Sequence, residues 1–223
     1  MQKIILLVVF VFTFGIVQAQ TERFEIGYQT SFGFYNDFDS YGTSRFLGPG
    51  MNIANGFTVF YNINPLLAIG SGIKFQNDIF YEDYDISVNE YTQLDLTQNK
   101  GYLHLPLIIR ESFGNRLKLY LNEGLILNYN IIDKIVTNRL YNTGESLRVV
   151  DYSTDLHNRF QVCATFAVGA SYSLNESFNI TAEFNPNVTI NPILIANFGN
   201  SFDVRRLHML FSVGVSYKLR RSH

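Results

Sequence analysis

"RFEIGYQTSFGF", residues Arg23–Phe34, alternates side chains of two kinds. Every second residue from Phe24 onward is large and apolar, except for Thr30, and the residues between them are charged, polar or glycine. Successive side chains of a strand point to opposite faces, so this stretch predicts a β-strand with one apolar and one polar face. Whether lipid or a protein core covers the apolar face distinguishes a membrane barrel from a soluble β protein.

The same two-residue period recurs in seven further segments, which brings the predicted number of strands to eight. These segments are Gly50–Asn62, Leu67–Ile79, Tyr102–Phe113, Leu117–Ile131, Arg159–Ser173, Phe178–Ile190 and Leu207–Leu219. Most of them reach the roughly 9–11 residues that a membrane-spanning strand requires. No stretch after the N-terminal region approaches the roughly 20 apolar residues of a transmembrane helix.

The connections between these strands alternate in length. Tight turns rich in turn-forming residues are predicted at Asn62–Leu66, Gly114–Arg116 and Leu174–Ser177. Long polar segments, interpreted as loops, separate the other strands: Asn36–Pro49, Phe80–Gly101, Ile132–Asn158 and Leu194–Arg206. Short periplasmic turns, long external loops and an even number of strands are typical of antiparallel outer-membrane barrels. The pattern therefore places both termini on the periplasmic side.

The polar face decides which side of the sheet meets lipid. Besides glycines it carries five charged residues: Lys74, Arg110, Lys118, Arg159 and Glu183. Such a face cannot form a dry core, but it can fill the narrow lumen of an eight-stranded barrel. We therefore predict an all-β, eight-stranded, antiparallel up-and-down transmembrane β-barrel, in which these five residues form a polar network in the lumen. A salt-bridged plug is favoured over a conduction path, because eight strands leave an interior just wide enough for side chains.

Aromatic residues and four irregular positions refine this prediction. Five aromatic residues near the predicted periplasmic ends suit an interfacial girdle; they are Phe24, Tyr61, Tyr172, Phe178 and Tyr217.

Pro106 lies within a strand and deletes a ladder hydrogen bond, so we expect a bulge or a local bend there. Glu123 has the parity of the lipid face, and we expect a bulge to turn it inward rather than a costly lipid-facing carboxylate. Pro186 and Pro192 predict an irregular outer end of the seventh strand.

Residues 1–19 are interpreted as a signal peptide that is cleaved after Ala19, which leaves residues 20–223 as the outer-membrane barrel domain. Lys3 precedes an almost wholly apolar run, and small residues surround the predicted cleavage site. An N-terminal membrane helix is the alternative, but the run is short for a membrane span. The formal net charge of −2 favours neither nucleic-acid binding nor a polybasic membrane surface.

The residues show no pattern of an active site, and we expect no cofactor and no metal. The single cysteine, Cys163, excludes an intrachain disulfide and a cysteine-built metal site. The histidines lack metal-ligand spacing, and His104 and His208 share the parity of the lumen face, where packing explains them. An enzyme acting on lipid or peptide at the barrel rim is an alternative, and a serine or a carboxylate beside His157 would support it.

Two consecutive segments carry a family resemblance. "YLHLPLIIR" (Tyr102–Arg110), a turn and "LKLYLNEGLILNY" (Leu117–Tyr129) resemble the PorT-type outer-membrane barrel family of Bacteroidetes. Glu123 stands where that family usually has a small residue, and the C-terminus runs on as "KLRRSH". The resemblance implies the same eight-stranded barrel in the outer membrane of a Gram-negative bacterium and carries no assigned activity.

The sequence thus favours a structural or surface-interaction role for the long external loops, because binding residues are often carried by loops on a rigid scaffold. We expect outer-membrane lipid to surround the barrel, and lipopolysaccharide or an envelope protein to be the partner that the loops bind. The rim enzyme is the first alternative. A soluble secreted barrel that binds a small apolar ligand is the second.

Overall fold

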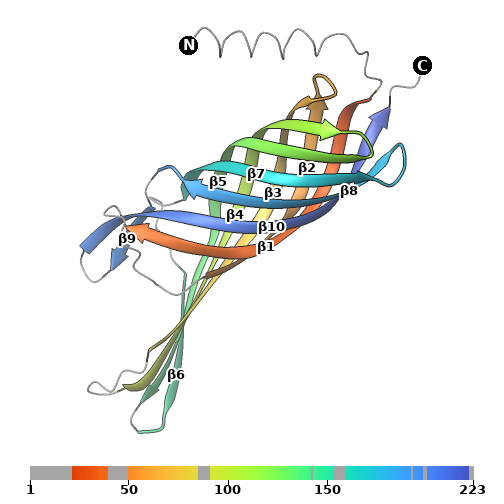
Figure 1. The fold of residues 1–223 in the computed structure, drawn as a ribbon. Helices are drawn as coiled ribbons and strands as arrows, with labels where there is room; N and C mark the ends of the chain where they lie inside the picture. The colour runs from red at the N-terminus through yellow and green to blue at the C-terminus, as the bar shows by residue number, and fades with distance from the viewer. Residues whose placement is uncertain are drawn as a thin grey trace.

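The computed structural model describes residues 22–39, 50–84, 91–141, 143–152, 159–191, 193–197 and 200–220. These residues form strands joined by turns (Figure 1). The strands are β1 (Glu22–Asp39), β2 (Gly50–Asn62), β3 (Leu67–Tyr84), β4 (Tyr91–Gly114), β5 (Leu117–Tyr141), β6 (Ser146–Tyr152), β7 (Phe160–Ser173), β8 (Phe178–Thr189), β9 (Ile193–Asn197) and β10 (Asn200–Arg220). Within these ranges no helix is long and apolar enough to cross a membrane.

Eight of the strands form a closed antiparallel barrel, which confirms the predicted fold. The ring runs β1-β2-β3-β4-β5-β7-β8-β10, and β10 pairs with β1 to close it. β6 pairs with β5 and β9 pairs with β10 as additions outside the ring. Closure gives the ring strands backbone partners on both sides, which a bilayer requires because it offers no water to unpaired groups.

The two faces of the barrel wall have the predicted polarity. Phe32, Leu107 and Val213 point outward and are 57%, 46% and 55% exposed, whereas Arg110 and Glu183 are each only 7% exposed. Apolar residues therefore cover the outside, where lipid would lie, and polar residues fill the interior. The soluble barrel with an apolar interior, the second alternative, is wrong for this reason.

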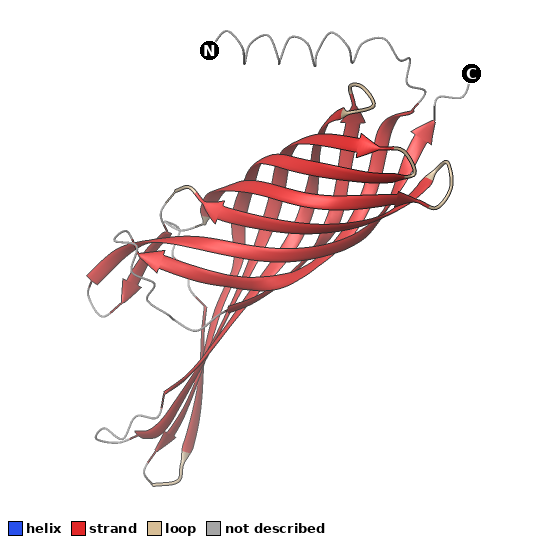
Figure 2. Cartoon of the chain, viewed as in Figure 1, coloured by secondary structure: helices blue, strands red, loops and turns tan. Residues whose placement is uncertain are grey.

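The three short turns lie at one end of the barrel, together with the start of β1 and the end of β10 (Figure 2). Asparagine side chains build two of these turns, because Oδ1 of Asn64 accepts from the backbone N–H groups of Leu66 and Leu67, both at 2.8 Å. Asn175 plays the same part before β8. Short turns mark the periplasmic end of bacterial barrels.

The predicted aromatic residues are placed at this short-turn end. The rings of Phe24 and Tyr61 lie 5.2 Å apart on neighbouring strands. The rings of Phe178 and Tyr217 lie 5.0 Å apart, and all four side chains are on the outer face. This arrangement is that of an interfacial girdle.

At the opposite end, much of what was predicted as loop is strand. β3 continues to Tyr84, and β4 and β5 extend beyond the ring as a narrow sheet that ends in β6 (Figures 1 and 2). We call this sheet the arm; it consists of residues 80–84, 91–101, 132–141 and 146–152. β9 and the start of β10 likewise pair within the segment predicted as the last loop. The loop predictions for these segments were wrong because neighbouring strands, rather than a buried apolar face, hold them in the β conformation.

The two prolines interrupt the sheet without shifting its register. Between the pairs Ser71↔Leu107 and Lys74↔His104 the β3–β4 ladder lacks two pairs, while the β4–β5 ladder continues past Pro106. Of the two irregularities expected at Pro106, a bulge or a local bend, the bulge is therefore absent, and the two missing pairs mark a local interruption of the ladder. At Pro186 the β7–β8 ladder lacks two pairs and the β8–β10 ladder continues. Pro192 lies outside the described residues.

Glu123 also keeps the regular register, so the inward-turning bulge expected there was wrong. It pairs with Ile109 on β4 and Phe166 on β7, and both ladders are continuous through it. Its side chain is exposed on the outer face, as the other predicted possibility required. The β4–β5 ladder shifts its register in two other places, between Gly101 and Tyr102 at the base of the arm and between Tyr91 and Gln93 within the arm.

Candidate functional site

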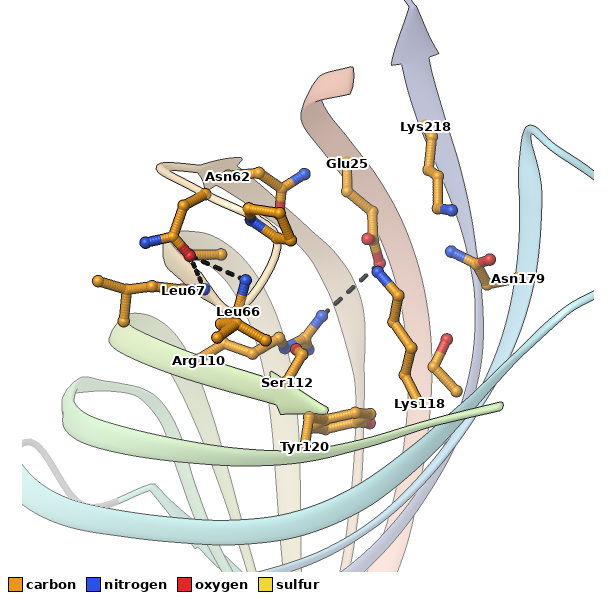
Figure 3. A pocket seen from close by; sticks show the side chains of 14 residues that line it. Glu25, Asn62, Leu66, Leu67, Arg110, Ser112, Lys118, Tyr120, Asn179 and Lys218 are labelled. Carbon is orange, nitrogen blue, oxygen red and sulfur yellow. Dashed lines mark hydrogen bonds and ion pairs between the residues drawn. The ribbon is translucent and has the colours of Figure 1, made fainter. Parts of the chain in front are cut away.

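The charged lumen is the first candidate site. At the short-turn end of the barrel, Arg110 is the central residue of this lumen. The Arg110 guanidinium lies between two aromatic rings, 3.6 Å from the ring centroid of Phe60 and 4.4 Å from that of Tyr120. Its Nε donates to Oδ1 of Asn122 at 2.9 Å, and its Nη1 lies 3.6 Å from Oε1 of Glu25 (Figure 3). Stacking and charge pairing together compensate the burial of this cation.

Glycines make room for the two rings that enclose Arg110. A Cβ atom on Gly70 would lie 2.4 Å from the ring of Phe60, and one on Gly169 would lie 2.3 Å from the ring of Tyr120. Both rings therefore lie flat over backbone that carries no side chain. Gly70 and Gly169 of the polar face thus serve the packing of the lumen.

Glu183 extends this cluster across the lumen. Asn122 donates from Nδ2 to Glu183 at 2.6 Å, and Asn185 donates to the same carboxylate at 3.1 Å. Lys74 donates to Gln29 at 2.7 Å and interacts electrostatically with Glu183 and Arg110. We call the group the turn-end cluster; its members are Glu25, Phe60, Lys74, Arg110, Tyr120, Asn122 and Glu183.

The other two residues of the predicted network lie elsewhere. Lys118 is half-buried at the mouth near the short turns, where it lines a pocket of about 40 Å³ with Glu25, Arg110 and Lys218 (Figure 3). Arg159 directly precedes β7 at the opposite end of the barrel, and its backbone oxygen accepts from the N–H of Asn130 at 2.7 Å. The structure thus brings Lys74, Arg110 and Glu183 together, with Lys118 at the rim and Arg159 apart.

A second charged cluster, absent from the sequence prediction, lies in the lumen further from the short turns. Arg206 Nη1 lies 3.0 Å from Asp78 Oδ2, and Gln76 donates to the same carboxylate group at 2.6 Å. The Tyr35 ring lies 4.2 Å from the Arg206 guanidinium and covers Gly50. We call Tyr35, Gln76, Asp78, Arg206 and His208 the far-end cluster.

The sequence pattern could have identified some residues of the far-end cluster but not others. Asp78 has lumen parity in the predicted third strand, so its position could have been included. Arg206 fell in a segment interpreted as loop, and its partner could not be identified without the strand order. Glu25, the ion-pair partner of Arg110, lies on the polar face of the opening stretch and was likewise missed.

The two histidines of the lumen, His104 and His208, are packed among other lumen side chains. Nδ1 of His208 lies 2.9 Å from Asn52 Nδ2 and 3.2 Å from Gln76 Nε2, and both His104 and His208 are buried. In the part of the chain that the structure describes, no three His, Cys, Asp or Glu side chains are arranged to hold a metal ion. His157 lies outside the described residues, so the rim enzyme stays a prediction.

The arm is the second candidate site, since it carries exposed apolar side chains and an open sheet edge. Leu147, Val150 and Tyr152 of β6 are 44%, 41% and 67% exposed. Among the described strands β6 pairs with β5 alone, which leaves its other edge open. Lys100 and Asp133 form an ion pair at 3.8 Å at the base of the arm. The arm can therefore present both side chains and backbone hydrogen-bonding groups to a partner.

Comparison with known proteins places the chain among barrels. The model of the family described as outer membrane protein beta-barrel domain matches residues 18–194. No curated protein matches the chain.

Several solved structures are similar over nearly their whole length. Neisserial surface protein A is 13% identical, with 88% of this chain and 97% of that chain covered and a TM-score of 0.40. Ail of Yersinia pestis in complex with the heparin analogue sucrose octasulfate is 12% identical, with 88% and 99% covered and a TM-score of 0.39. OprG of Pseudomonas aeruginosa is 11% identical, with 91% and 98% covered and a TM-score of 0.43.

Proposed function

Because the chain belongs to the outer membrane protein beta-barrel domain family, we propose that its barrel anchors the arm in the outer membrane and that the arm binds a partner at the cell surface. The observation that carries this proposal is the length of β4 and β5, which hold 24 and 25 residues. A tilted strand crosses the bilayer in about 9–11 residues. Each strand is therefore long enough to cross the membrane and to continue outside it as part of the arm.

The filled lumen argues against a role in transport. An eight-stranded barrel has an interior just wide enough for side chains. The turn-end and far-end clusters each place an arginine, an aromatic ring and a carboxylate across that interior. The proposed role therefore rests on the outside of the protein, and we assign no catalysis to it.

The chemistry of the arm favours an envelope protein over lipopolysaccharide as the partner. The open edge of β6 can accept an extended strand, and the exposed Leu147, Val150 and Tyr152 can contact the side chains of that strand. Glycolipid phosphates would instead require a cluster of basic residues. The exposed Arg148 and Asp151 of β6 have opposite charges, so this strand presents no such cluster.

Two finer assignments complete the proposal. The motifs at Tyr102–Arg110 and Leu117–Tyr129 support a PorT-type barrel of Bacteroidetes. Residues 1–19 have the features of a signal peptide, and N-terminal sequencing of the protein from outer membranes should begin at Gln20. A first residue within 1–19 would contradict that cleavage site.

Removal of the arm tests the proposal. The arm-less variant has short Gly-Ser linkers in place of residues 81–97 and 135–152, so the ring strands remain complete. Its barrel should still show the heat-dependent shift on SDS gels, while surface crosslinking from a photoreactive residue at position 152 of the full protein identifies the partner. The proposal predicts that the arm-less variant no longer retains this purified partner. Undiminished binding to a correctly folded arm-less barrel would overturn it.

A further inference from the structure

Glu123 places a carboxyl group on the face of the barrel that meets lipid. Its neighbours across the strands, Ile109 and Phe166, are 52% and 47% exposed, and Leu125 on the same strand is 42% exposed. No described residue forms an ion pair or a hydrogen bond with the Glu123 side chain. The group therefore lies unpaired among apolar side chains.

The position of Glu123 along its strand puts this carboxyl group deep in the membrane. It follows Leu117, the first residue of β5, by six positions. At a rise of about 3.3 Å per residue and a tilt of about 40°, it lies about 15 Å from the short-turn end. The apolar band of such barrels is about 25 Å tall, so Glu123 is near its middle. An ionisable group at that depth is costly and commonly marks a functional contact.

A groove on the lipid-facing surface adjoins Glu123. Its volume is about 590 Å³, and it extends over β2, β3, β4 and β5 with Val59, Ile69, Ser71, Ile109 and Leu125 among its lining residues. Gly70 and Gly124 also line it. A Cβ on Gly124 would lie 2.0 Å from the backbone oxygen of Leu107, so the close approach of β4 and β5 requires glycine at that position. The groove is therefore a hollow in the lipid-facing surface of the wall.

Charge restricts what can occupy this groove beside Glu123. Lipid acyl chains offer no hydrogen-bond donor, and lipid headgroups lie at the interface rather than at mid-depth. A second copy of the chain offers no cation at this depth: the described residues that face outward along the middle of the ring strands include no Lys or Arg, and the outward-facing Arg205 lies near the outer end of β10, where it pairs with Phe38 of β1. A carboxylate in low dielectric is best compensated by a basic partner.

We propose that Glu123 and the adjoining groove form an interface, within the membrane, for a different membrane-spanning protein that presents a lysine or arginine at this depth. Aliphatic side chains of that partner would fill the groove, and its cation would pair with the Glu123 carboxylate. This interface is independent of the arm, which lies beyond the membrane end of the barrel.

Photocrosslinking in native outer membranes tests the interface. A photoreactive residue at position 109 should form an adduct with a second protein, and one at position 32 should not, because β1 lies across the ring from β5. Glu123→Gln preserves the shape and removes the charge, so it should reduce the adduct at least tenfold, as should Glu123→Leu. The arm-less variant should retain the adduct, which separates this proposal from the preceding one.

The identity of the crosslinked residue completes the test. The proposal predicts a Lys or Arg close to the crosslinked position in a membrane-spanning segment of the partner. Glu123→Lys should abolish the adduct, and changing the partner's basic residue to Glu should restore it. An adduct that withstands Glu123→Gln, or that contains lipid alone or a second copy of this chain, would overturn the proposal.

The isolated barrel provides an independent measurement. In lipid vesicles without a partner, Glu123→Leu should raise the denaturant midpoint, because it removes an unpaired polar group from hydrocarbon. A lowered midpoint would show that Glu123 stabilises its own barrel, and this result would contradict the proposed external partner.

Discussion

Arg206 Nη1 lies 3.0 Å from Asp78 Oδ2, although 128 positions separate the two residues in the chain. The Arg206 side chain is 4% exposed and that of Asp78 is 1% exposed. The pair joins β10 to β3, which are not neighbours in the ring. It therefore braces the barrel across its lumen, whereas the ladders connect only adjacent strands.

Asp78→Asn should destabilise the barrel by about 3–5 kcal/mol, because it leaves the buried Arg206 cation without its counter-charge. Urea unfolding of the refolded barrel in lipid vesicles measures this loss. Asp133→Asn is the matched control, since the pair of Asp133 with Lys100 is partly exposed. Its loss should cost only about 0–1 kcal/mol. Equal effects of the two substitutions would contradict the bracing role of the lumen pair.

Replacing both partners should recover much of this stability. The double variant Asp78→Leu with Arg206→Met removes both charges and preserves volume, and such exchanges of buried pairs are often neutral or stabilising. The same unfolding experiment compares the double variant with Asp78→Asn. If the double variant is less stable than Asp78→Asn, hydrogen bonds around the pair, rather than its charges, hold this part of the lumen together.

Arg110→Lys should destabilise the barrel even though the charge is kept. A lysine ammonium cannot stack between Phe60 and Tyr120 as the planar guanidinium does, and it provides fewer oriented donors for Asn122 and Glu25. We expect a loss of about 1–2 kcal/mol from the two cation–π contacts. Lys118→Arg at the half-buried mouth is the control, and it should change the unfolding midpoint little. An unchanged midpoint for Arg110→Lys would show that charge alone matters.

Gly169→Ala should displace the Tyr120 ring, because the added Cβ would lie 2.3 Å from it. Overpacking of this kind costs about 1–3 kcal/mol. In a Tyr120→Ala background the same substitution should cost much less, and the double-mutant cycle measures this coupling. Additive effects would mean that the glycine serves its own strand rather than the ring.

The reconstituted barrel should not conduct ions, because two side-chain clusters occupy its lumen. Planar bilayer recordings with the purified protein should show no stepwise currents. Arg110→Ala alone should stay silent, since the far-end cluster still fills the lumen. Stable single-channel steps from the wild-type protein would contradict the plugged interior.

The strands of the ring, and which of their faces points outward, were predictable because apolar and polar residues alternate along each membrane-spanning segment. β2 coincides with the predicted Gly50–Asn62, since its buried and exposed residues alternate over almost its whole length. The arm was missed because its strands have no dominant apolar face. Their β conformation depends on pairing with neighbours, as in the β5–β6 ladder, and that information is not local.

The parity of a residue in its strand predicted whether its side chain points into the lumen, but it did not predict which residue that side chain contacts. Arg110 and Glu183 were correctly expected to point inward, whereas the stagger of the strands decides that Arg110 contacts Phe60 and Glu25. For Glu123, the direction of the side chain was indicated correctly by parity, but the expected backbone geometry was wrong. Its parity indicated the lipid side, and the bulge expected from its cost in hydrocarbon does not exist.

The sidedness of the wall is the central claim, and quenching by brominated lipids tests it most directly. Single cysteines are introduced one at a time along β2 and β10 in a Cys163→Ala background, labelled with a small fluorophore and reconstituted into vesicles. Labels at Phe57 and Val213 should be strongly quenched, and labels at Thr58 and Ser212 should be protected. Strong quenching at the second pair with protection at the first would contradict the account.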